Sequence, residues 1–405
     1  MSYDVIIVGA GPAGATAALF ANRMGLNCIL LDKAVFPRDK ICGDALSGKS
    51  VRIMNELGIL DEVAKLEGAE INRITFGSPN NKQFDINLLG SKNKDKIKKG
   101  FVILRQIFDN YLFEKANEVT DSRQGFSVKE IILDEDQVVG VRGKSKTGEF
   151  EEFHAPLILG CDGYNSIVAR RLGLYEMDMD NTSVAVRCYY EGVKDLTDQI
   201  ELHYLKEVNP GYFWLFPAGN GKANIGVGLS KSDMKKERRT LRQIMDEITQ
   251  SDYFKERFSD AVQLEKPVGW NLPVGSKHRK NHGNGFLLLG DAAGLIDPFT
   301  GEGIGNAMVS GKYAMEIAAK SKVSGDYSES ALAEYDALLW GEIGKELKTS
   351  TKLQSMARSQ FLLNFVINRA ARNEEVQHII SGMLLNEIPK DELGGPLFYL
   401  KILFL

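Results

Sequence analysis

Residues 4–14 read Asp4-Val-Ile-Ile-Val-Gly9-Ala-Gly11-Pro-Ala-Gly14, and residues 28–33 read Cys28-Ile-Leu-Leu-Asp32-Lys33. This pattern predicts a buried strand, a tight turn, a helix over 13–24 and a second strand. Gly9 allows the turn, Gly11 lets the backbone approach a pyrophosphate, and Gly14 lets the helix pack closely on the sheet. The free amides of the helix N-terminus would bind the phosphates, and Asp32 would bind ribose hydroxyls. The stretch therefore predicts a dinucleotide-binding unit.

Length, charge and cysteine content narrow the class of protein. The chain has 405 residues, more than the roughly 250–300 at which single cores stop growing, so a second domain is expected. The net charge of −4 argues against a nucleic-acid partner. The four cysteines form no CxxC pair, which predicts reduced thiols, a cytoplasmic location and no metal site. No apolar stretch approaches the roughly 20 residues that a membrane-spanning helix needs.

A second acid-and-glycine pattern favours a flavin over a nicotinamide nucleotide. The chain reads Phe286-Leu-Leu-Leu-Gly290-Asp291 and, shortly after, Gly301-Glu-Gly303-Ile304-Gly305. A carboxylate at the end of this strand can hold a ribitol hydroxyl, and the glycines allow the backbone to approach a flat ring. A helix predicted over 305–321 would point its N-terminus at a flavin oxygen. The turn at Cys161-Asp162-Gly163 repeats the strand-then-acid arrangement between the two signatures.

These motifs resemble the FAD-dependent para-hydroxybenzoate hydroxylase-like superfamily. The segment Leu104-Arg105-x-x-Phe108-Asp109 is a further match. The resemblance implies an α/β fold with a Rossmann-like FAD-binding domain of the GR2 type and FAD as cofactor. It implies FAD contacts from Gly9, Gly11, Pro12, Ala13, Gly14, Asp32, Lys33, Cys42, Gly43, Arg105, Asp162, Gly163, Gly290, Asp291, Pro298, Gly301, Gly303 and Ile304. Arg105 could instead pair with Asp109 one helical turn on, but the resemblance favours the cofactor role.

Within that superfamily the chain resembles geranylgeranyl reductases. The first matching motif is Tyr212-Phe-Trp214-Leu-Phe216-Pro217, followed by Gly226-Val-Gly228. Tyr212, Trp214 and Phe216 alternate, so on a strand they share one face and form a broad aromatic surface. Periodicity alone favours ordinary sheet packing. The resemblance implies instead that these aromatics and Pro217 bind a long hydrocarbon substrate, with Tyr212 and Trp214 stabilising positive charge through cation–π attraction.

The second matching motif is Pro37-Arg38-Asp-Lys40-Ile-Cys42-Gly43, in a loop that could fold back toward the flavin ring. The resemblance places Cys42 beside the flavin. A free cysteine is more often a small buried residue, but Arg38 and Lys40 would favour a thiolate here. In its neutral thiol form Cys42 is also a candidate catalytic proton donor, with water or the N–H of a reducing cofactor as the alternatives.

The two kinds of signature divide the chain into three parts. The FAD-binding domain is expected from residues 1–70, 100–175 and 275–325. An inserted antiparallel β-sheet domain for the substrate is expected from 71–99 and 176–274, with a charged helix near 231–248. A helical region is expected from 326–405, with helices over 331–353 and 374–385. The apolar residues 396–405 could dock on the protein itself, which is favoured, or touch the inner face of a membrane.

The preferred function is a FAD-dependent oxidoreductase that reduces C=C bonds of geranylgeranyl or other polyprenyl groups on a lipid, a diphosphate or a quinone. The resemblance implies hydride delivery to one alkene carbon and a proton to the other. Two alternatives are an aromatic monooxygenase or halogenase on the same scaffold and a flavoprotein that passes electrons to a quinone. No second GxGxxG unit is present, so NAD(P)H, a reduced quinone and a ferredoxin all stay open as electron donor. The oligomeric state is open as well.

Overall fold

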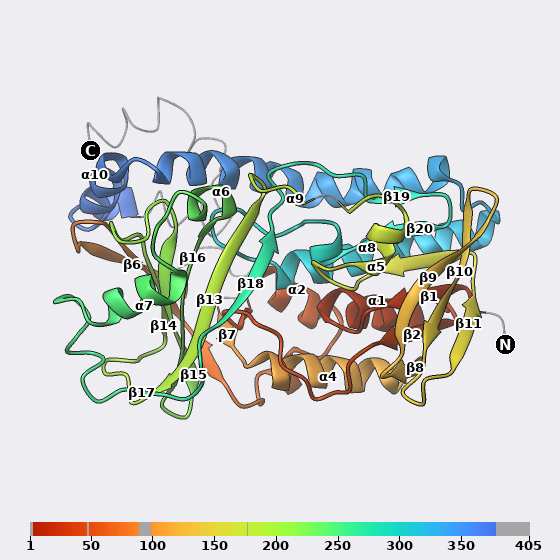
Figure 1. Cartoon of the computed structure of the whole chain (residues 1–405), viewed down its shortest axis with the longest axis horizontal. Coiled ribbons are helices and arrows are strands. Elements are labelled where there is room, and N and C mark those ends of the chain that lie inside the picture. Colours follow the sequence, from red (N-terminus) through yellow and green to blue (C-terminus); the bar gives the residue numbers. More distant parts are fainter. Residues whose placement is uncertain (1–2, 47, 89–98, 176, 378–405) are drawn as a thin grey trace.

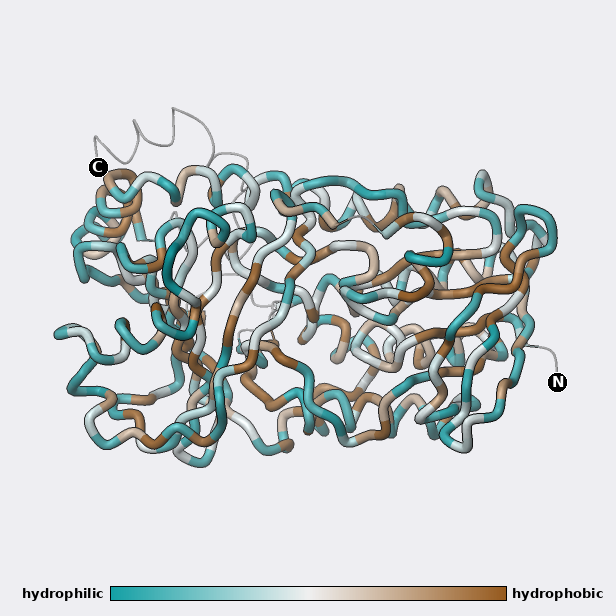
Figure 2. Tube along the Cα trace, viewed as in Figure 1, coloured by the Kyte–Doolittle hydropathy of each residue, from teal (hydrophilic) through white to brown (hydrophobic). Residues whose placement is uncertain are grey.

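The computed structural model describes residues 3–46, 48–88, 99–175 and 177–377. Two β-sheets, one at each end of the long axis, organise the chain (Figure 1). Hydrophobic residues concentrate along the inner strands and helices, while hydrophilic residues fill the outer loops (Figure 2). The interior packing therefore divides between the two sheets and the helices that cover them.

The first sheet has six strands in the order β19-β20-β12-β1-β2-β8. The strands are β1 (Val5–Val8), β2 (Cys28–Asp32), β8 (Asp121–Gln124), β12 (Leu157–Gly160), β19 (His282–Gly283) and β20 (Phe286–Leu288). β1 is the centre of this sheet and pairs in parallel with both β2 and β12, with Ile6 opposite Ile29 and Ile158. All four residues of β1 are buried, as expected for a parallel sheet covered on both faces.

Helices cover this sheet, and two of them confirm the sequence prediction closely. α1 (Pro12–Arg23) follows β1, and α8 (Ile304–Ser324) follows the second signature. The two helices pack so closely that a Cβ at Gly311 would lie 2.6 Å from the carbonyl oxygen of Ala13. The other helices of this half are α2 (Gly48–Glu56), α3 (Leu60–Val63), α4 (Arg105–Asn117), α5 (Ile167–Arg171) and the short 3₁₀ helix η2 (Gly290–Ala292).

Two three-stranded sheets complete this half and its link to the other. The first consists of β9 (Ser127–Asp134), β10 (Gln137–Lys144) and β11 (Phe150–His154), paired antiparallel. The second has the order β3-β7-β4, with β3 (Ala45–Leu46), β4 (Ala69–Ile71) and β7 (Gly100–Val102). Because β4 leads directly into the larger sheet, the second small sheet joins the two halves.

The larger sheet has eight strands, with the path β17-β13-β16-β15-β14-β5-β6 and β18 also paired with β13. The strands are β5 (Arg73–Gly77), β6 (Gln83–Asn87), β13 (Thr182–Glu191), β14 (Gln199–His203), β15 (Tyr212–Gly219), β16 (Lys222–Ser230), β17 (Val262–Gln263) and β18 (Val268–Pro273). The predicted antiparallel sheet is confirmed, with one exception, because β14 and β5 run parallel. No hairpin joins these two strands, so no short connection imposes the antiparallel direction.

Two helices lie where one was predicted. α6 (Lys231–Met234) and α7 (Leu241–Thr249) replace the single helix expected over 231–248. Thr240 begins α7 through a capping box with Gln243, and this cap separates it from α6.

Long helices end the described part of the chain. α9 (Glu329–Ala357) runs along the top of Figure 1, from the six-stranded sheet to the larger one, and α10 (Gln360–Ala370) follows it. The helix predicted over 331–353 is therefore confirmed as α9. Only 374–377 of the helix predicted over 374–385 is described, and the apolar end 396–405 lies outside the described residues. None of the helices in the described ranges is long and apolar enough to cross a membrane.

Candidate active site

A cavity of about 1840 Å³ lies between the two halves of the molecule. Most residues predicted to bind FAD or substrate line it: Gly9, Gly11, Pro12, Ala13, Asp32, Lys33, Cys42, Gly43, Arg105, Asp162, Gly163, Tyr212, Trp214, Phe216, Gly290, Asp291, Gly301, Gly303 and Ile304. Segments far apart in the sequence thus meet around one space.

Three predicted residues lie outside this lining. Gly14 packs inside the first motif instead, since a Cβ there would lie 1.9 Å from the carbonyl oxygen of Gly9. Pro217 follows Phe216 on β15, and the alternation of a strand places it on the other face. Pro298 lines a separate, smaller pocket beside Phe299. The structure therefore places these three outside the cavity lining, and their contact with a ligand stays a prediction.

The first glycine-rich turn has the shape that a pyrophosphate requires. Gly9 has a φ of 104°, and a Cβ there would lie 2.4 Å from the carbonyl oxygen of Cys161. At Gly11 the nearest atom to an added Cβ is Arg38 Nη2, 3.6 Å away, so the backbone is open on the cavity side. α1 begins after Gly11, which has no side chain to cap the first-turn amides. This open cradle fits the phosphates of FAD.

The acids at the strand ends organise their own turns. Asp32 accepts hydrogen bonds from the amides of Ala10 and Ala34, each at 2.7 Å. Asp162 accepts from the amides of Ile167 at 2.6 Å and Val168 at 3.3 Å. The resemblance implies a ligand role for both carboxylates, and an Asp-Gly turn is the local alternative at Asp162. A carboxylate has about four acceptor positions, so Asp32 can hold its turn and still accept from a ribose hydroxyl.

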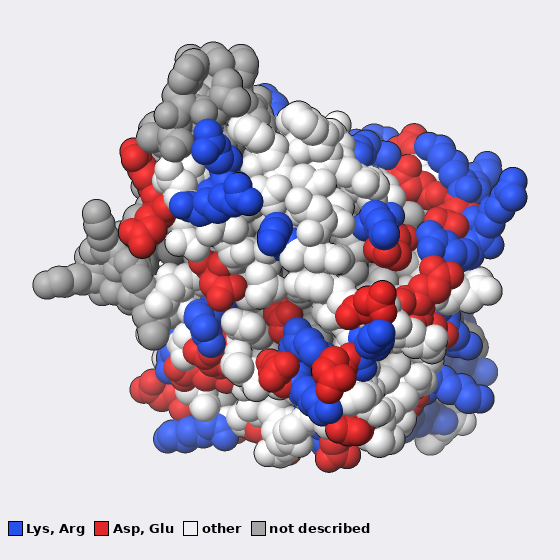
Figure 3. All heavy atoms as spheres, turned by 90° about the vertical axis from the view of Figure 1, so that its left-hand side faces the viewer, with Lys and Arg blue, Asp and Glu red and all other residues white. Residues whose placement is uncertain are grey.

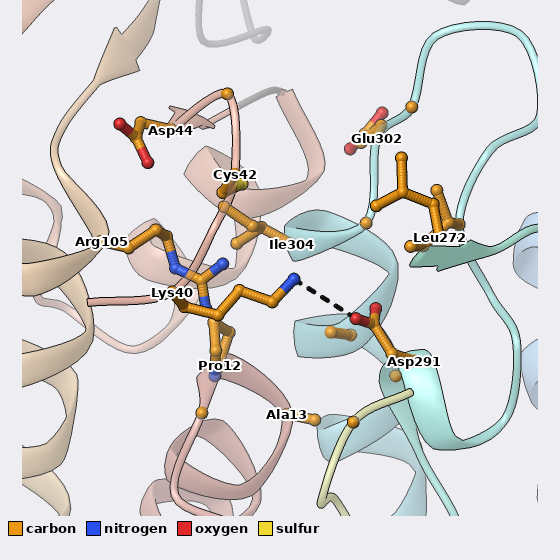
Figure 4. Close-up of a pocket in the computed structure, with 18 of the residues that line it drawn as sticks. Pro12, Ala13, Lys40, Cys42, Asp44, Arg105, Leu272, Asp291, Glu302 and Ile304 are labelled. Atoms are coloured by element: carbon orange, nitrogen blue, oxygen red, sulfur yellow. Dashed lines mark hydrogen bonds and ion pairs between the residues drawn. The ribbon is translucent and has the colours of Figure 1, made fainter. Parts of the chain in front are cut away.

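The second signature brings charged groups to the opposite side of the cavity. Lys40 extends toward Asp291, and the two side chains pair at 3.4 Å (Figure 4). Lys49 pairs with Glu346 at 2.6 Å and with Glu302 at 3.8 Å. α8 begins after Gly303, again with no side-chain cap, so its N-terminal amides and dipole favour an electronegative ligand atom. This end of the cavity is suited to the ring end of a flavin.

Arg105 forms an ion pair with Asp109, the alternative that the family resemblance did not favour. Its Nε and Nη2 contact the two oxygens of Asp109 at 2.5 and 2.7 Å, and Arg38 contacts the same carboxylate at 2.5 Å. Burial would raise the pKa of Asp109, but the charges of Arg105 and Arg38 lower it overall. Arg105 also interacts with the side chain of Cys42. The cation beside the thiol is therefore Arg105, whereas the expected partners Arg38 and Lys40 are paired elsewhere.

The aromatic residues of β15 line the substrate side of the cavity. The ring centroids of Tyr212 and Trp214 are 6.1 Å apart, and those of Trp214 and Phe216 are 6.4 Å apart. Tyr212 donates a hydrogen bond to the carbonyl of Thr300 at 2.8 Å. Further apolar lining comes from Ile71, Ile74, Phe76, Leu88, Ile200, Leu202 and Leu272. We call Tyr212, Trp214 and Phe216 the aromatic wall; these residues both pack in the sheet core and face the cavity.

Sequence reasoning missed two buried polar residues, Asp44 and Asn224, next to this wall. Asp44 is fully buried, with a φ of 66°, and accepts hydrogen bonds from Tyr189 at 2.6 Å and Asn224 at 2.8 Å. Burial raises the pKa of Asp44 to about 6 despite these bonds. Asn224 also accepts from the indole of Trp214. A signal was present, because Asn224 alternates with Gly226 and Gly228 on the strand that pairs with β15.

Comparison with known proteins identifies the family to which the chain belongs. The FAD binding domain family matches residues 2–337. A digeranylgeranylglycerophospholipid reductase of Methanopyrus kandleri is 29% identical over 96% of both chains, and another from that organism is 31% identical over 83% of this chain and 85% of its own. One from Methanococcoides burtonii is 31% identical over 85% and 81%.

Solved structures share the fold. A geranylgeranyl bacteriochlorophyll reductase-like protein from Thermoplasma acidophilum has a TM-score of 0.83 at 23% identity, covering 97% of this chain and 98% of its own. A flavin-dependent brominase has a TM-score of 0.76 at 22% identity over 93% of each chain. At these identities the likeness concerns architecture alone. From the family match and the relatives above 30% identity, this chain belongs to the FAD-binding-domain family and, within it, to the digeranylgeranylglycerophospholipid reductases.

Proposed function

We propose that this protein is a FAD-dependent reductase that saturates C=C bonds in geranylgeranyl chains carried by a glycerophospholipid. The relatives above 30% identity are reductases named for such a lipid. The observation that carries the proposal is the single cavity, which reaches from the phosphate cradle at Gly11 to the aromatic wall at Trp214. Ligands bound at the two ends would therefore share one continuous space.

The residues that line the cavity have different roles in the proposed reaction. FAD, when bound, supplies the hydride. The turn at Gly9 and Gly11 and the N-terminus of α8 orient the cofactor. The apolar lining receives the hydrocarbon and excludes water, which strengthens electrostatic interactions inside. An isolated alkene has no carbonyl to polarise, so the faces of Tyr212 and Trp214 stabilise the positive charge that develops on carbon.

Cys42 is the proposed proton-donating group on the protein side. It lies in the turn before Asp44, is partly exposed to the cavity, and interacts with Arg105. The other three cysteines, Cys28, Cys161 and Cys188, are buried. Cys161 also lines the cavity but is buried, so the partly exposed Cys42 is the cysteine that we assign to this role.

The test is an anaerobic reaction of chemically reduced protein with one candidate substrate at a time. Chemical reduction bypasses the external electron donor. We expect flavin reoxidation together with two added hydrogen masses per bond for a digeranylgeranyl glycerophospholipid. Reoxidation only by air, with oxygen or halogen gained by an aromatic substrate, would favour a monooxygenase or halogenase. Geranylgeranyl diphosphate and a prenylated quinone serve as competing substrates.

We also propose that α10 brings the protein to a lipid surface. Phe361, in its first turn, is 76% exposed. The face of the molecule that carries α10 mixes Lys and Arg with Asp and Glu around an area without charged side chains (Figure 3). Flotation with vesicles of anionic phospholipid should fall for Phe361→Glu, because a charge there opposes insertion at the interface. Equal flotation of variant and wild type would count against this contact.

A further inference from the structure

Asn224 lies fully buried on β16, at the point where the aromatic wall meets the loop that carries Cys42. Its side-chain oxygen accepts a hydrogen bond from the Trp214 indole Nε1 at 2.9 Å. Its side-chain nitrogen donates to the carbonyl oxygen of Cys42 and to Asp44 Oδ2, each at 2.8 Å. One amide thus bonds the aromatic wall on one side and the Cys42 turn on the other.

The turn also packs directly on the wall. A Cβ at Gly43 would lie 3.1 Å from the ring of Phe216 and 3.7 Å from Trp214 Nε1. This closeness leaves the indole and the turn little freedom to slide past each other. The amide of Asn224 restrains them further, because its planar group hydrogen-bonds the indole on one side and the turn on the other.

A second set of contacts anchors the far side of the turn. Asp44 accepts from the hydroxyl of Tyr189, and the guanidinium of Arg187 lies 4.2 Å from the centre of the Tyr189 ring. Arg187 pairs in turn with Asp39 and Glu265. The turn that carries Cys42 is therefore tied to β13 through Tyr189 and to β16 through Asn224.

We propose that Asn224 is a positioning residue that keeps the face of Trp214 and the thiol of Cys42 in one fixed relation. This inference rests on the proposed function, in which Trp214 stabilises charge on one alkene carbon while Cys42 delivers the proton to the other. Such a division of labour requires both groups to be held at the same time. Asn224 touches neither the alkene nor the flavin and acts through the two residues that do.

Two substitutions separate the hydrogen bond that Asn224 makes with Trp214 from the two that it makes with the Cys42 turn. Asn224→Leu has nearly the same size and removes all three hydrogen bonds. Asn224→Asp keeps an acceptor for the Trp214 indole but removes both donors to the turn. Asn110→Leu is the matched control, because Asn110 is half-buried on α4 and its side chain donates to Glu114. FAD content and melting temperature show whether each variant is folded.

Two readouts need no prenyl substrate. The first is the rate at which Cys42 of the holoenzyme is alkylated, followed by peptide mass spectrometry. The second is the indole N–H resonance of Trp214, which the variant Trp214→Phe identifies among the three tryptophans of the chain. We expect Asn224→Leu to raise the alkylation rate about tenfold, as loss of ordinary hydrogen bonds would allow, and to move the resonance. Asn224→Asp should raise the alkylation rate and leave the resonance near its wild-type position.

Steady-state kinetics give the third readout. A fall in kcat with little change in KM is expected for both variants, because the geometry matters most in the transition state. The proposal would be overturned if Asn224→Leu left both the alkylation rate and the Trp214 resonance unchanged. This holds whether or not the variant also binds less FAD or melts at a lower temperature. If Asn224→Leu does not fold, Asn224→Asp decides by its alkylation rate alone. A wild-type protein that reduces no geranylgeranyl lipid would refute the proposed function. The first two readouts would still test whether Asn224 holds Trp214 and the Cys42 turn together.

Discussion

At the scale of single residues, the indole of Trp214 occupies the space that a side chain at position 226 would need. A Cβ on Gly226 would lie 2.0 Å from Cζ2 of that ring. This contact explains why the paired strand has a glycine at position 226, directly opposite Trp214. The indole of Trp214 and strand β16 therefore pack so closely that one added methyl group would not fit between them.

Gly226→Ala is expected to push the indole out of place. Overpacking of this kind costs about 1–3 kcal/mol, so the melting temperature should fall. Prenyl reduction should fall further than FAD content, because the cradle at Gly11 lies elsewhere. Gly269→Ala is the control, since a Cβ there would meet its nearest atoms at 3.5 Å, an ordinary contact. Full activity in Gly226→Ala would mean that the position of the Trp214 ring is unimportant.

Asp44 gives a prediction about pH. Burial raises its pKa from 3.8 to about 6, against the hydrogen bonds of Tyr189 and Asn224 and the charges of Arg187 and Arg105. The folded state then binds the proton more tightly than the unfolded state, so this residue lowers stability as pH rises from about 4 through 6. Relative to wild type, Asp44→Asn should gain on the order of 3 kcal/mol over that range. Urea unfolding of both proteins at several pH values measures the difference. A difference that stays constant with pH would show that Asp44 keeps an ordinary pKa.

Some residue roles were predictable and others were not. Gly9, Gly11 and Asp32 follow from a local pattern, because the turn and its helix are made by neighbours in the chain. The pairing of Arg105 with Asp109 was visible at a spacing of four residues. Asp44 was hidden, since no local pattern marks a buried carboxylate. Asn224 had a signal in its alternation with Gly226 and Gly228, but nothing local identified its partner Asp44, which lies 180 residues away in the chain.

At the scale of elements, the contact between α1 and α8 holds the two nucleotide signatures together. Each helix begins at the cavity, and at Gly311 the backbone of α1 is so close that an added Cβ would collide with the carbonyl oxygen of Ala13. Both helices were predictable, since each follows an apolar strand and a glycine-rich turn. Their packing was not, because it joins residues separated by most of the chain.

Gly311→Ala is therefore expected to weaken FAD binding without touching the ligand. The added methyl group would lie 2.6 Å from the carbonyl oxygen of Ala13, which is backbone and cannot turn aside. The helices must separate, and the two signatures with them. FAD affinity can be measured by titrating the apoprotein. Gly341→Ala, at an open position of α9, should leave affinity unchanged. A wild-type affinity in Gly311→Ala would show that the spacing of the helices does not matter.

The errors at this scale have local and non-local causes. The prediction of a single helix over 231–248 overlooked the capping box of Thr240 and Gln243, although the sequence contains this signal. The parallel pair of β14 and β5 had no such signal. Residues from the six-stranded half lie between these strands in the chain, so their direction is set by the assembled fold rather than by a turn.

At the scale of the whole molecule, two sheets built from interleaved chain segments enclose one cavity. The sequence predicted the interleaving, while the division into domains over 1–70, 100–175 and 275–325 against the rest stays a prediction. Continuity of the space from Gly11 to Trp214 could not be predicted, because a cavity is defined by side chains from both halves together. This continuity is what links the cofactor site to the hydrocarbon site.

Trp214→Ala tests whether the two ends of the cavity act separately. Removing the indole takes away a cation–π face and part of the apolar wall, while the phosphate cradle stays intact. We expect turnover to fall by at least about tenfold, a change of 1.4 kcal/mol in the barrier, with FAD content near that of wild type. Trp214→Phe should retain more activity. Equal loss of FAD and turnover in Trp214→Ala would mean that the residue is only structural.

The most direct test of the account is the fate of hydrogen in the reaction run in D₂O. Chemically reduced protein and a digeranylgeranyl glycerophospholipid are mixed without oxygen, and the recovered lipid is examined by mass spectrometry. The hydrogens on flavin nitrogen and on a thiol exchange with solvent, so each saturated bond should carry two deuterium atoms. Recovery of the lipid unchanged, or modified without deuterium, would contradict the claim that this cavity reduces prenyl chains.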